Sequence, residues 1–464
     1  MRLRRDLRGG NTVLGGIATA VTRALDDPAF APLLPERAAA GGVDFEHAWG
    51  QRTWAVSGVL AGTRVDGDPR ALTRLQRAAY RLYQRPDAGH LALDTTRSDL
   101  AGRFSAFSVA KTGGRHWLGS STFEETTPGF ETNDLGFQQR ADRRSWSNAL
   151  TYRETRIGRV FRDYSVGGYL THSRNFDGDV VATRPAIEGS ATLRSFWRAF
   201  AIASFSAPAY DDRLTRGGPV VRAPRRWSVD ASLTSDSRRP AVVELSGSTA
   251  RSAAGEWERE VGVALDLRPS AALRVRVEPE LSRAYTASQY VTAGADPLAA
   301  ATFGRRYVFA DLRQDEVAAD VRVDWTFTPR LSLELFARPF ASRGRYLAFK
   351  ALERPRAFDF ATYGAEAGTA TRAGGRVTLD PDGPGAAPAL AFDEPDYAVR
   401  SLRGNAVARW EFRPGSTLFV VWQQQRDGLP AEAGRGTLGG SALRAFGDRG
   451  TDVLLLKVSR WIGR

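Results

Sequence analysis

The stretch that decides the fold runs from Val317 to Phe340 and reads VAADVRVDWTFTPRLSLELFARPF. Apolar and polar side chains alternate along both halves, and a short turn at Thr328-Pro329-Arg330 separates them. Alternation with a period of two predicts β-strands. The stretch is therefore expected to form a hairpin with one apolar and one charged face, which suits either a soluble antiparallel sheet or a transmembrane barrel.

The same pattern recurs along the chain and predicts about 18 strands without the helix-strand alternation of α/β folds. Tight turns alternate with long polar loops, as the periplasmic turns and external loops of outer-membrane barrels do. External loops are expected near residues 65–98, 126–144, 207–225, 284–304, 343–402 and 427–450. The expected fold is all-β: residues 1–464 form a large antiparallel transmembrane β-barrel.

Composition excludes several kinds of protein. The 464 residues contain no cysteine, which removes thiolate chemistry and cysteine-ligated metal sites. Mean hydropathy is -0.34, too polar for a membrane protein built of helices, although half-polar barrel strands escape that test. The net charge of +13 comes without any nucleic-acid-binding motif, so no nucleic-acid partner is expected, and no cofactor or metal site is indicated.

Tryptophan gathers near the tight turns and the C-terminus. Rings in those positions are typical of an interfacial girdle, where an apolar ring meets lipid and the indole N–H stays hydrated. Outer-membrane lipid is therefore an expected partner. The candidate girdle consists of Trp49, Trp117, Trp197, Trp325, Trp410 and Trp461.

One segment has a helical pattern. Asp68 and Pro69 suit the first positions of a helix, and arginines flank an apolar stripe at Leu72 and Leu75. Two interpretations remain open: a helix in a solvated external loop, or a basic lid over the barrel.

Several strings resemble those of an outer-membrane barrel family of unknown function: Arg8-Gly9-Gly10-Asn11-Thr12, residues 133–142 (NDLGFQQRAD), Arg216-Gly217-Gly218-Pro219, residues 304–310 (GRRYVFA) and residues 325–329 (WTFTP). Full-length members resemble a fusion of a signal peptide, a carbohydrate-binding family nine-like domain and a long C-terminal barrel. The resemblance implies that Met1 lies within the barrel, that a sugar-binding module and early strands are missing, and that outer-membrane assembly machinery is a partner. The loop motif candidates are Asn133, Asp134, Arg216, Gly217 and Gly218.

No catalytic residue can be assigned from the sequence. The four histidines form no metal-binding motif, although His47 or His116 could serve as a base if distant strands assembled a triad. The resemblance adds that some family members carry the label of membrane-associated hydrolase. A membrane-associated hydrolase therefore remains the alternative function.

The remaining candidates are charged side chains expected to line a water-filled lumen. They are Arg274, Arg276, Glu278, Glu280, Asp320, Arg322 and Asp324. Such a ladder either solvates the wall or steers solutes. The favoured function is a barrel that anchors a sugar-binding module and mediates the passage or capture of carbohydrate-derived solutes.

Overall fold

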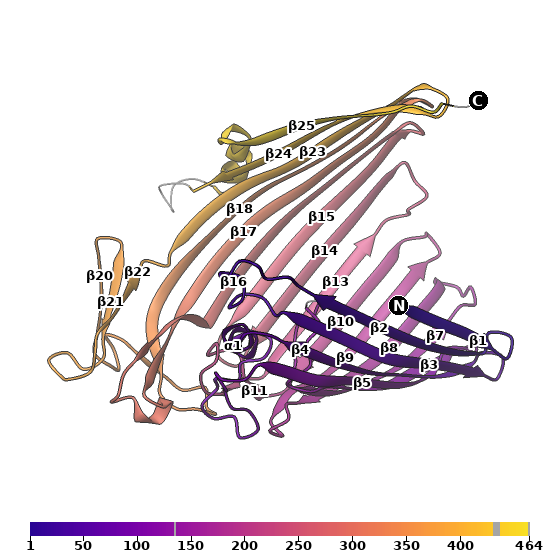
Figure 1. Ribbon diagram of the computed structural model, residues 1–464. Helices are drawn as coiled ribbons and strands as arrows, with labels where there is room; N and C mark the ends of the chain where they lie inside the picture. Colours follow the sequence, from indigo (N-terminus) through magenta and orange to yellow (C-terminus); the bar gives the residue numbers. More distant parts are fainter. Residues whose placement is uncertain (134–135, 430–436, 463–464) are drawn as a thin grey trace.

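The computed structural model describes residues 1–133, 136–429 and 437–462, and it is dominated by one antiparallel sheet of 20 strands (Figure 1). The prediction of an all-β fold with a large antiparallel sheet is confirmed. The first half of the sheet contains β1 (Arg2–Leu7), β2 (Thr12–Thr22), β3 (Arg37–Trp49), β4 (Trp54–Asp66), β5 (Asp99–Lys111), β6 (Trp117–Thr126), β7 (Arg143–Glu154), β8 (Phe161–Arg174), β9 (Val180–Leu193) and β10 (Arg198–Ser206). The second half contains β13 (Arg226–Thr234), β14 (Ala241–Ser252), β15 (Trp257–Ser270), β16 (Leu273–Ala295), β17 (Arg305–Thr328), β18 (Leu331–Leu352), β19 (Phe360–Thr362), β23 (Tyr397–Arg413), β24 (Ser416–Gly428) and β25 (Gly450–Ser459).

The sheet is a meander in which each long strand pairs with the next long strand along the chain. The connections β1–β2, β3–β4, β5–β6, β7–β8, β9–β10, β13–β14, β15–β16, β17–β18 and β23–β24 are therefore at one end, which we call the turn rim. The longer connections lie at the opposite end. They include two small sheets, β11 (Ala209–Asp211) with β12 (Val221–Ala223), and β20 (Thr369–Ala373) with β21 (Arg376–Asp380) and β22 (Leu390–Asp393).

Two of the expected external loops are largely strand. β16 continues to Ala295, within the expected loop 284–304, and β18 continues to Leu352, within the expected loop 343–402. The pairing of β16 with β17 shifts register between Thr286 and Gln289 and again between Tyr290 and Thr292. Each bulge inserts an extra residue and changes which face the following side chains occupy. The simple period-two pattern is lost there, which hid the strands from the sequence.

The sheet is deeply curved, but it does not close on itself. Within the described part of the chain, β1 pairs only with β2 and β25 pairs only with β24. Figure 1 shows these two strands at opposite borders of a wide opening. In the described part of the chain, the sheet is thus an open wall with two unpaired edges, as expected for a barrel portion that lacks early strands. Each edge exposes backbone N–H and C=O groups that a neighbouring strand could bind.

Helices are few. α1 (Pro69–Arg77) confirms the expected helix: Asp68 is its N-cap, Pro69 its first residue, and the Asp68 side chain accepts a hydrogen bond from Arg70 N–H. α2 (Leu438–Arg444) and two short 3-10 helices, η1 (Ala300–Thr302) and η2 (Ala445–Gly447), lie in long connections. Among the described residues, no helix is both long and apolar enough to cross a membrane.

Candidate functional site

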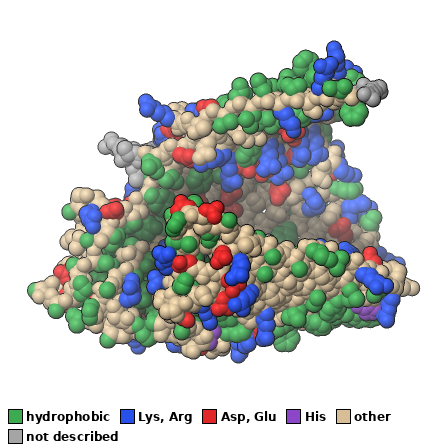
Figure 2. All heavy atoms as spheres, in the orientation of Figure 1, with side chains coloured by type: hydrophobic (Ala, Val, Ile, Leu, Met, Phe, Trp, Pro, Cys, Tyr) green, Lys and Arg blue, Asp and Glu red, His purple; other side chains and the backbone are tan. Residues whose placement is uncertain are grey.

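The inner face of the curved wall carries charge. Figure 2 shows basic and acidic side chains inside the hollow, and patches of hydrophobic side chains on the outer surface that faces the viewer. The seven charged residues singled out in the sequence lie on adjacent strands, β16 and β17, with Arg274 opposite Asp324, Arg276 opposite Arg322 and Glu278 opposite Asp320. The register brings them together as one cross-strand ladder on one face of the sheet.

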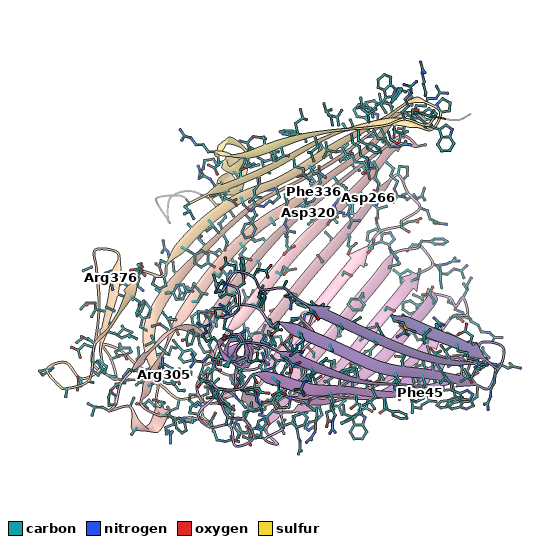
Figure 3. All side chains as sticks on the ribbon, in the orientation of Figure 1. Phe45, Asp266, Arg305, Asp320, Phe336 and Arg376 are labelled. Carbon is teal, nitrogen blue, oxygen red and sulfur yellow. The ribbon has the colours of Figure 1, made fainter. Side chains whose placement is uncertain are left out.

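Most charges of this ladder have a partner of opposite sign, either within the ladder or on a neighbouring strand. Arg274 Nε donates to Asp266 Oδ1 of β15 at 3.1 Å, and Asp320 lies 3.4 Å from Arg338 and 3.8 Å from Arg322. Arg276 pairs with Glu278, and Arg322 also lies over the ring of Phe336, 5.4 Å from its centroid. Figure 3 shows Asp266, Asp320 and Phe336 on the same stretch of wall. Alternating paired charges suit a hydrated surface with little net field.

The six tryptophans of the candidate girdle are exposed, and all lie at the turn rim. Some stack with a neighbouring ring: Trp49 with Trp54 at 6.4 Å and Trp325 with Phe327 at 4.3 Å between centroids. Exposed, mutually stacked rings in a single row around a sheet suit a membrane–water interface better than a soluble surface.

A second aromatic row, which was not predicted from the sequence, lies nearer the loop end of the sheet. Phe123 is directly opposite Trp146, and Phe205 is directly opposite Trp227; all four rings are exposed. Six residues separate Trp117 from Phe123 on β6 and eight separate Trp197 from Phe205, which corresponds to roughly 20–27 Å of strand. An outer-membrane barrel has an apolar band of about 25 Å between two such rows. The aromatic residues of this row lie at similar distances along the chain from the tight turns, and this spacing is the sequence signal that could have revealed them.

The loops opposite the turn rim pack into a layer that we call the loop cap, comprising residues 67–98, 127–133, 136–142, 175–179, 207–225 and 353–359. On one side α1 packs against Ala38, Val65 and Leu100 of β3, β4 and β5. On the other side, Val221 of β12 packs against Tyr307 and Phe309 of β17. The loop cap therefore reaches from the β3–β5 wall to the β17 wall, across the inside of the curved sheet.

A buried ion pair joins two segments of the loop cap. Arg81 Nη1 donates to Glu131 Oε2 at 2.8 Å, and both side chains are 0% exposed. Arg81 Nε also donates to the carbonyl of Pro128 at 2.9 Å, and the Tyr80 hydroxyl donates to Glu131 Oε2 at 3.0 Å. Glu131 N–H in turn donates to Thr63 Oγ1 of β4 at 2.9 Å. Two loops and one strand are thereby fixed at one charged centre.

A second buried centre joins four loops through Arg85, which lies 3.7 Å from Asp142 and 3.6 Å from Asp212. Asp142 also bonds His90 Nε2 at 2.8 Å and accepts from Phe176 N–H at 3.0 Å. Burial alone would raise the pKa of Asp142, but hydrogen bonds from His90 and Phe176 and the nearby arginine charge outweigh it and lower the pKa. Asp142 is therefore held ionised inside the cap.

His90 should make the loop cap sensitive to pH. Burial alone would lower the pKa of His90, but the hydrogen bond and charge of Asp142, with the charge of Asp177, raise it above the ordinary 6.5. A raised pKa in the folded state stabilises the cap below about pH 6.5, and this contribution is lost as pH rises through the folded-state pKa. Protection of residues 87–92 against amide hydrogen exchange should therefore decrease between about pH 6 and pH 8.

The matched control for this pH effect is His172, which bonds Thr183 Oγ1 at 2.9 Å within the wall. His90→Gln should remove the pH dependence of protection in the loop cap, and His172→Gln should leave it intact. Equal pH dependence in the wild type and His90→Gln would contradict the assignment.

The loop motif candidates lie in two different parts of the loop cap. Asn133 Oδ1 accepts from Gln138 N–H at 2.8 Å and orders the loop that carries Glu131, while Asp134 lies outside the described residues. Arg216, Gly217 and Gly218 belong to the β11–β12 connection and line a cavity of about 380 Å³. The two motifs do not form a single site.

The two histidines considered as catalytic bases lie at the turn rim. His47 Nδ1 bonds Thr12 Oγ1 at 2.9 Å, and His116 Nδ1 bonds the Arg153 carbonyl at 3.0 Å. Neither contact supplies the serine that a triad requires. Within the described residues, no cluster of three or more histidine and carboxylate side chains is arranged to hold a metal ion.

These features define a class of protein: a wide antiparallel β-meander with an apolar outer surface, a charged inner wall and a folded layer of loops at one end. The chain belongs to the family described as Domain of unknown function (DUF5916), whose model matches residues 74–436. No curated protein matches the chain.

Three solved structures are similar at low sequence identity. The siderophore receptor PirA from Acinetobacter baumannii is 10% identical, with 97% of this chain and 73% of that chain covered and a TM-score of 0.43. The FpvAI-pyocin S2 complex gives 9% identity, coverage of 90% and 66%, and a TM-score of 0.41. The ferric yersiniabactin uptake receptor FyuA from Yersinia pestis gives 10% identity, coverage of 92% and 72%, and a TM-score of 0.28.

Proposed function

We propose that this protein forms the wall of an outer-membrane β-barrel through which small hydrophilic solutes, including carbohydrate-derived ones, pass or are captured. The observation that carries the proposal is the opposite chemistry of the two faces of one sheet. Exposed apolar side chains lie between two aromatic rows on the outside, and paired charges line the inside. An apolar outer face and a charged inner face suit a barrel wall that contacts lipid on the outside and water on the inside.

The loop cap supports a selective role. Its segments are joined by buried ion pairs and reach across the inside of the wall, so a solute entering from that end meets a folded layer. A rigid constriction with charged groups discriminates solutes by size and charge.

The proposal includes further strands that cover β1 and β25. Backbone groups at an open edge have no water to bind within the hydrocarbon region, and each unsatisfied group costs several kcal/mol. Anchoring of a sugar-binding module also belongs to the proposal and is supported by the resemblance of the sequence strings. Outer-membrane lipid and the assembly machinery are the corresponding partners.

Reconstitution into lipid vesicles tests the proposal. Vesicles containing the protein should swell in glucose or a disaccharide faster than empty vesicles, and the protein should migrate differently on gels before and after heating. A protein that stays soluble without detergent, or vesicles that remain impermeable to every sugar, would overturn it.

A further inference from the structure

We propose that a cavity between the loop cap and the β16–β17 wall binds a small hydroxylated solute that carries an oxyanion, such as a sugar phosphate or a sugar acid. The proposal rests on the proposed function, since it names the solute class that the barrel would recognise. The cavity has a volume of about 380 Å³, within the range of roughly 300–1,000 Å³ usual for small-molecule sites. The residues that line it include Arg77, Gln84, Arg216, Tyr290, Arg305 and Tyr307.

Three guanidinium groups converge on this cavity from separate elements. Arg77 ends α1, Arg216 lies between β11 and β12, and Arg305 begins β17. None of the three has a carboxylate within 4.0 Å among the described residues, and no carboxylate lines the cavity. By contrast, Arg81, Arg85, Arg140 and Arg356 of the loop cap each have a carboxylate partner. A site with three guanidinium groups that lack carboxylate partners selects anions. Each guanidinium group can donate two parallel hydrogen bonds to two oxygens of one phosphate or carboxylate group.

Asp87, which follows the lining residue Pro86 in the chain, is engaged with the backbone. Asp87 Oδ2 accepts a hydrogen bond from Val220 N–H at 2.6 Å, and Asp87 is not among the residues that line the cavity. The cavity therefore keeps a positive potential.

Aromatic rings and an amide supply the other features of the site. Tyr290 lies with Arg216 above its ring, 4.7 Å from the centroid, and Tyr307 is almost fully buried beside it. The buried Oε1 of Gln84 has no hydrogen-bond partner among the described residues. A ligand hydroxyl would satisfy this amide oxygen, and the accessible part of the half-buried Tyr290 side chain would contact the carbon skeleton of a sugar. Hydroxyls and an oxyanion together describe a sugar acid or a sugar phosphate.

The Arg216-Gly217-Gly218 motif is explained by this cavity. Gly217 has φ of +103°, and a Cβ added there would lie 2.2 Å from Gln84 Nε2; a Cβ added at Gly218 would lie 2.2 Å from Tyr307 Cε1. Only glycine lets the loop approach both residues so closely, and this approach holds Arg216 over Tyr290.

Titration calorimetry on the detergent-solubilised full chain tests the site with four probes: glucose 6-phosphate, glucuronate, inorganic phosphate and glucose. We expect both anionic sugars to bind more tightly than inorganic phosphate, glucose to bind at least about 10-fold more weakly than glucose 6-phosphate, and added salt to weaken binding. Arg216→Gln with Arg305→Gln should weaken binding of glucose 6-phosphate at least about 10-fold, and Arg216→Lys should retain part of it.

Arg376→Gln is the matched control, because Arg376 is exposed on the β20–β22 sheet, pairs with Asp393 at 3.2 Å and lies on the projecting hairpin in Figure 3, away from Arg305. It should leave all affinities unchanged.

Equal binding of glucose and glucose 6-phosphate, or no effect of the double variant, would overturn the proposal. Binding only to vesicles with a phosphomonoester lipid would also overturn it in favour of a headgroup site. If the vesicles are impermeable but the anionic sugars still bind, the proposed passage of solutes is refuted and the binding site is retained. If the vesicles swell in glucose but no anion binds, the binding site is refuted and the passage of solutes is retained.

Discussion

Arg81→Ala should loosen the loop cap by about 3–5 kcal/mol, the usual cost of removing one partner of a buried ion pair. The Glu131 carboxyl group, whose side chain is 0% exposed, would lose its cation and keep only the hydrogen bonds from the Tyr80 hydroxyl at 3.0 Å and from Asn133 N–H at 2.7 Å. The expected result is faster amide hydrogen exchange and faster tryptic cleavage across residues 67–98 and 127–133, while β13–β15 keep their protection. If the cap restricts passage, vesicles with this variant should also swell faster.

Arg70→Ala provides the control, because Arg70 pairs with Asp68 at 3.1 Å on the surface, where water screens an ion pair and its loss should leave the protection of the loop cap unchanged. A second control replaces both partners, as Arg81→Met with Glu131→Leu, and should recover much of the lost protection since no uncompensated charge remains. Unchanged protection in Arg81→Ala would show that this pair does not hold the cap together.

Leu245→Arg should destabilise the membrane-inserted protein by about 2–4 kcal/mol, as arginine does on the lipid face near the midplane of a barrel. Leu245 lies on β14, is 50% exposed and is directly opposite Val263 of β15 in the outer apolar surface. It is five residues from Pro240 of the adjoining tight turn, which places it between the two aromatic rows. The free energy of unfolding from lipid bilayers in urea or guanidinium is the measurement.

Glu244→Arg is the matched control one residue away. Glu244 lies on the opposite face of β14, so an arginine there should meet water and change the stability by less than about 1 kcal/mol. Equal destabilisation by the two substitutions would mean that the faces have been assigned to the wrong solvents.

Local sequence was enough to predict the strands whose side chains alternate without interruption, such as β14 and the turn-proximal part of β17. The tight turns were equally readable because Pro and Gly mark them, as at Thr328-Pro329-Arg330, where the structure reduces the connection to Pro329 and Arg330. The outer halves of β16 and β18 were missed because bulges shift the alternation and because their apolar residues pack against loops. The second aromatic row was missed because Phe123 and Trp146 come from separate strands and meet only through register.

The candidate site divides in the same way. The ladder of Arg274, Glu278 and Asp320 was predictable because every member faces the same side of its own strand. The loop cap was not, because Arg81 and Glu131 are 50 residues apart and nothing local marks either side chain as buried. The arginine cavity was equally hidden, since Arg77, Arg216 and Arg305 come from three distant segments.

By itself, the amino-acid sequence determined an antiparallel β architecture with two unlike faces, because side-chain direction in a strand depends only on the parity of position along the chain. Tertiary structure alone decided how far the sheet curves, that its edges β1 and β25 remain apart, and which loop residues meet in the cap and the cavity. Those outcomes depend on register, bulges and long-range ion pairs, whose partners are chosen by the folded chain as a whole.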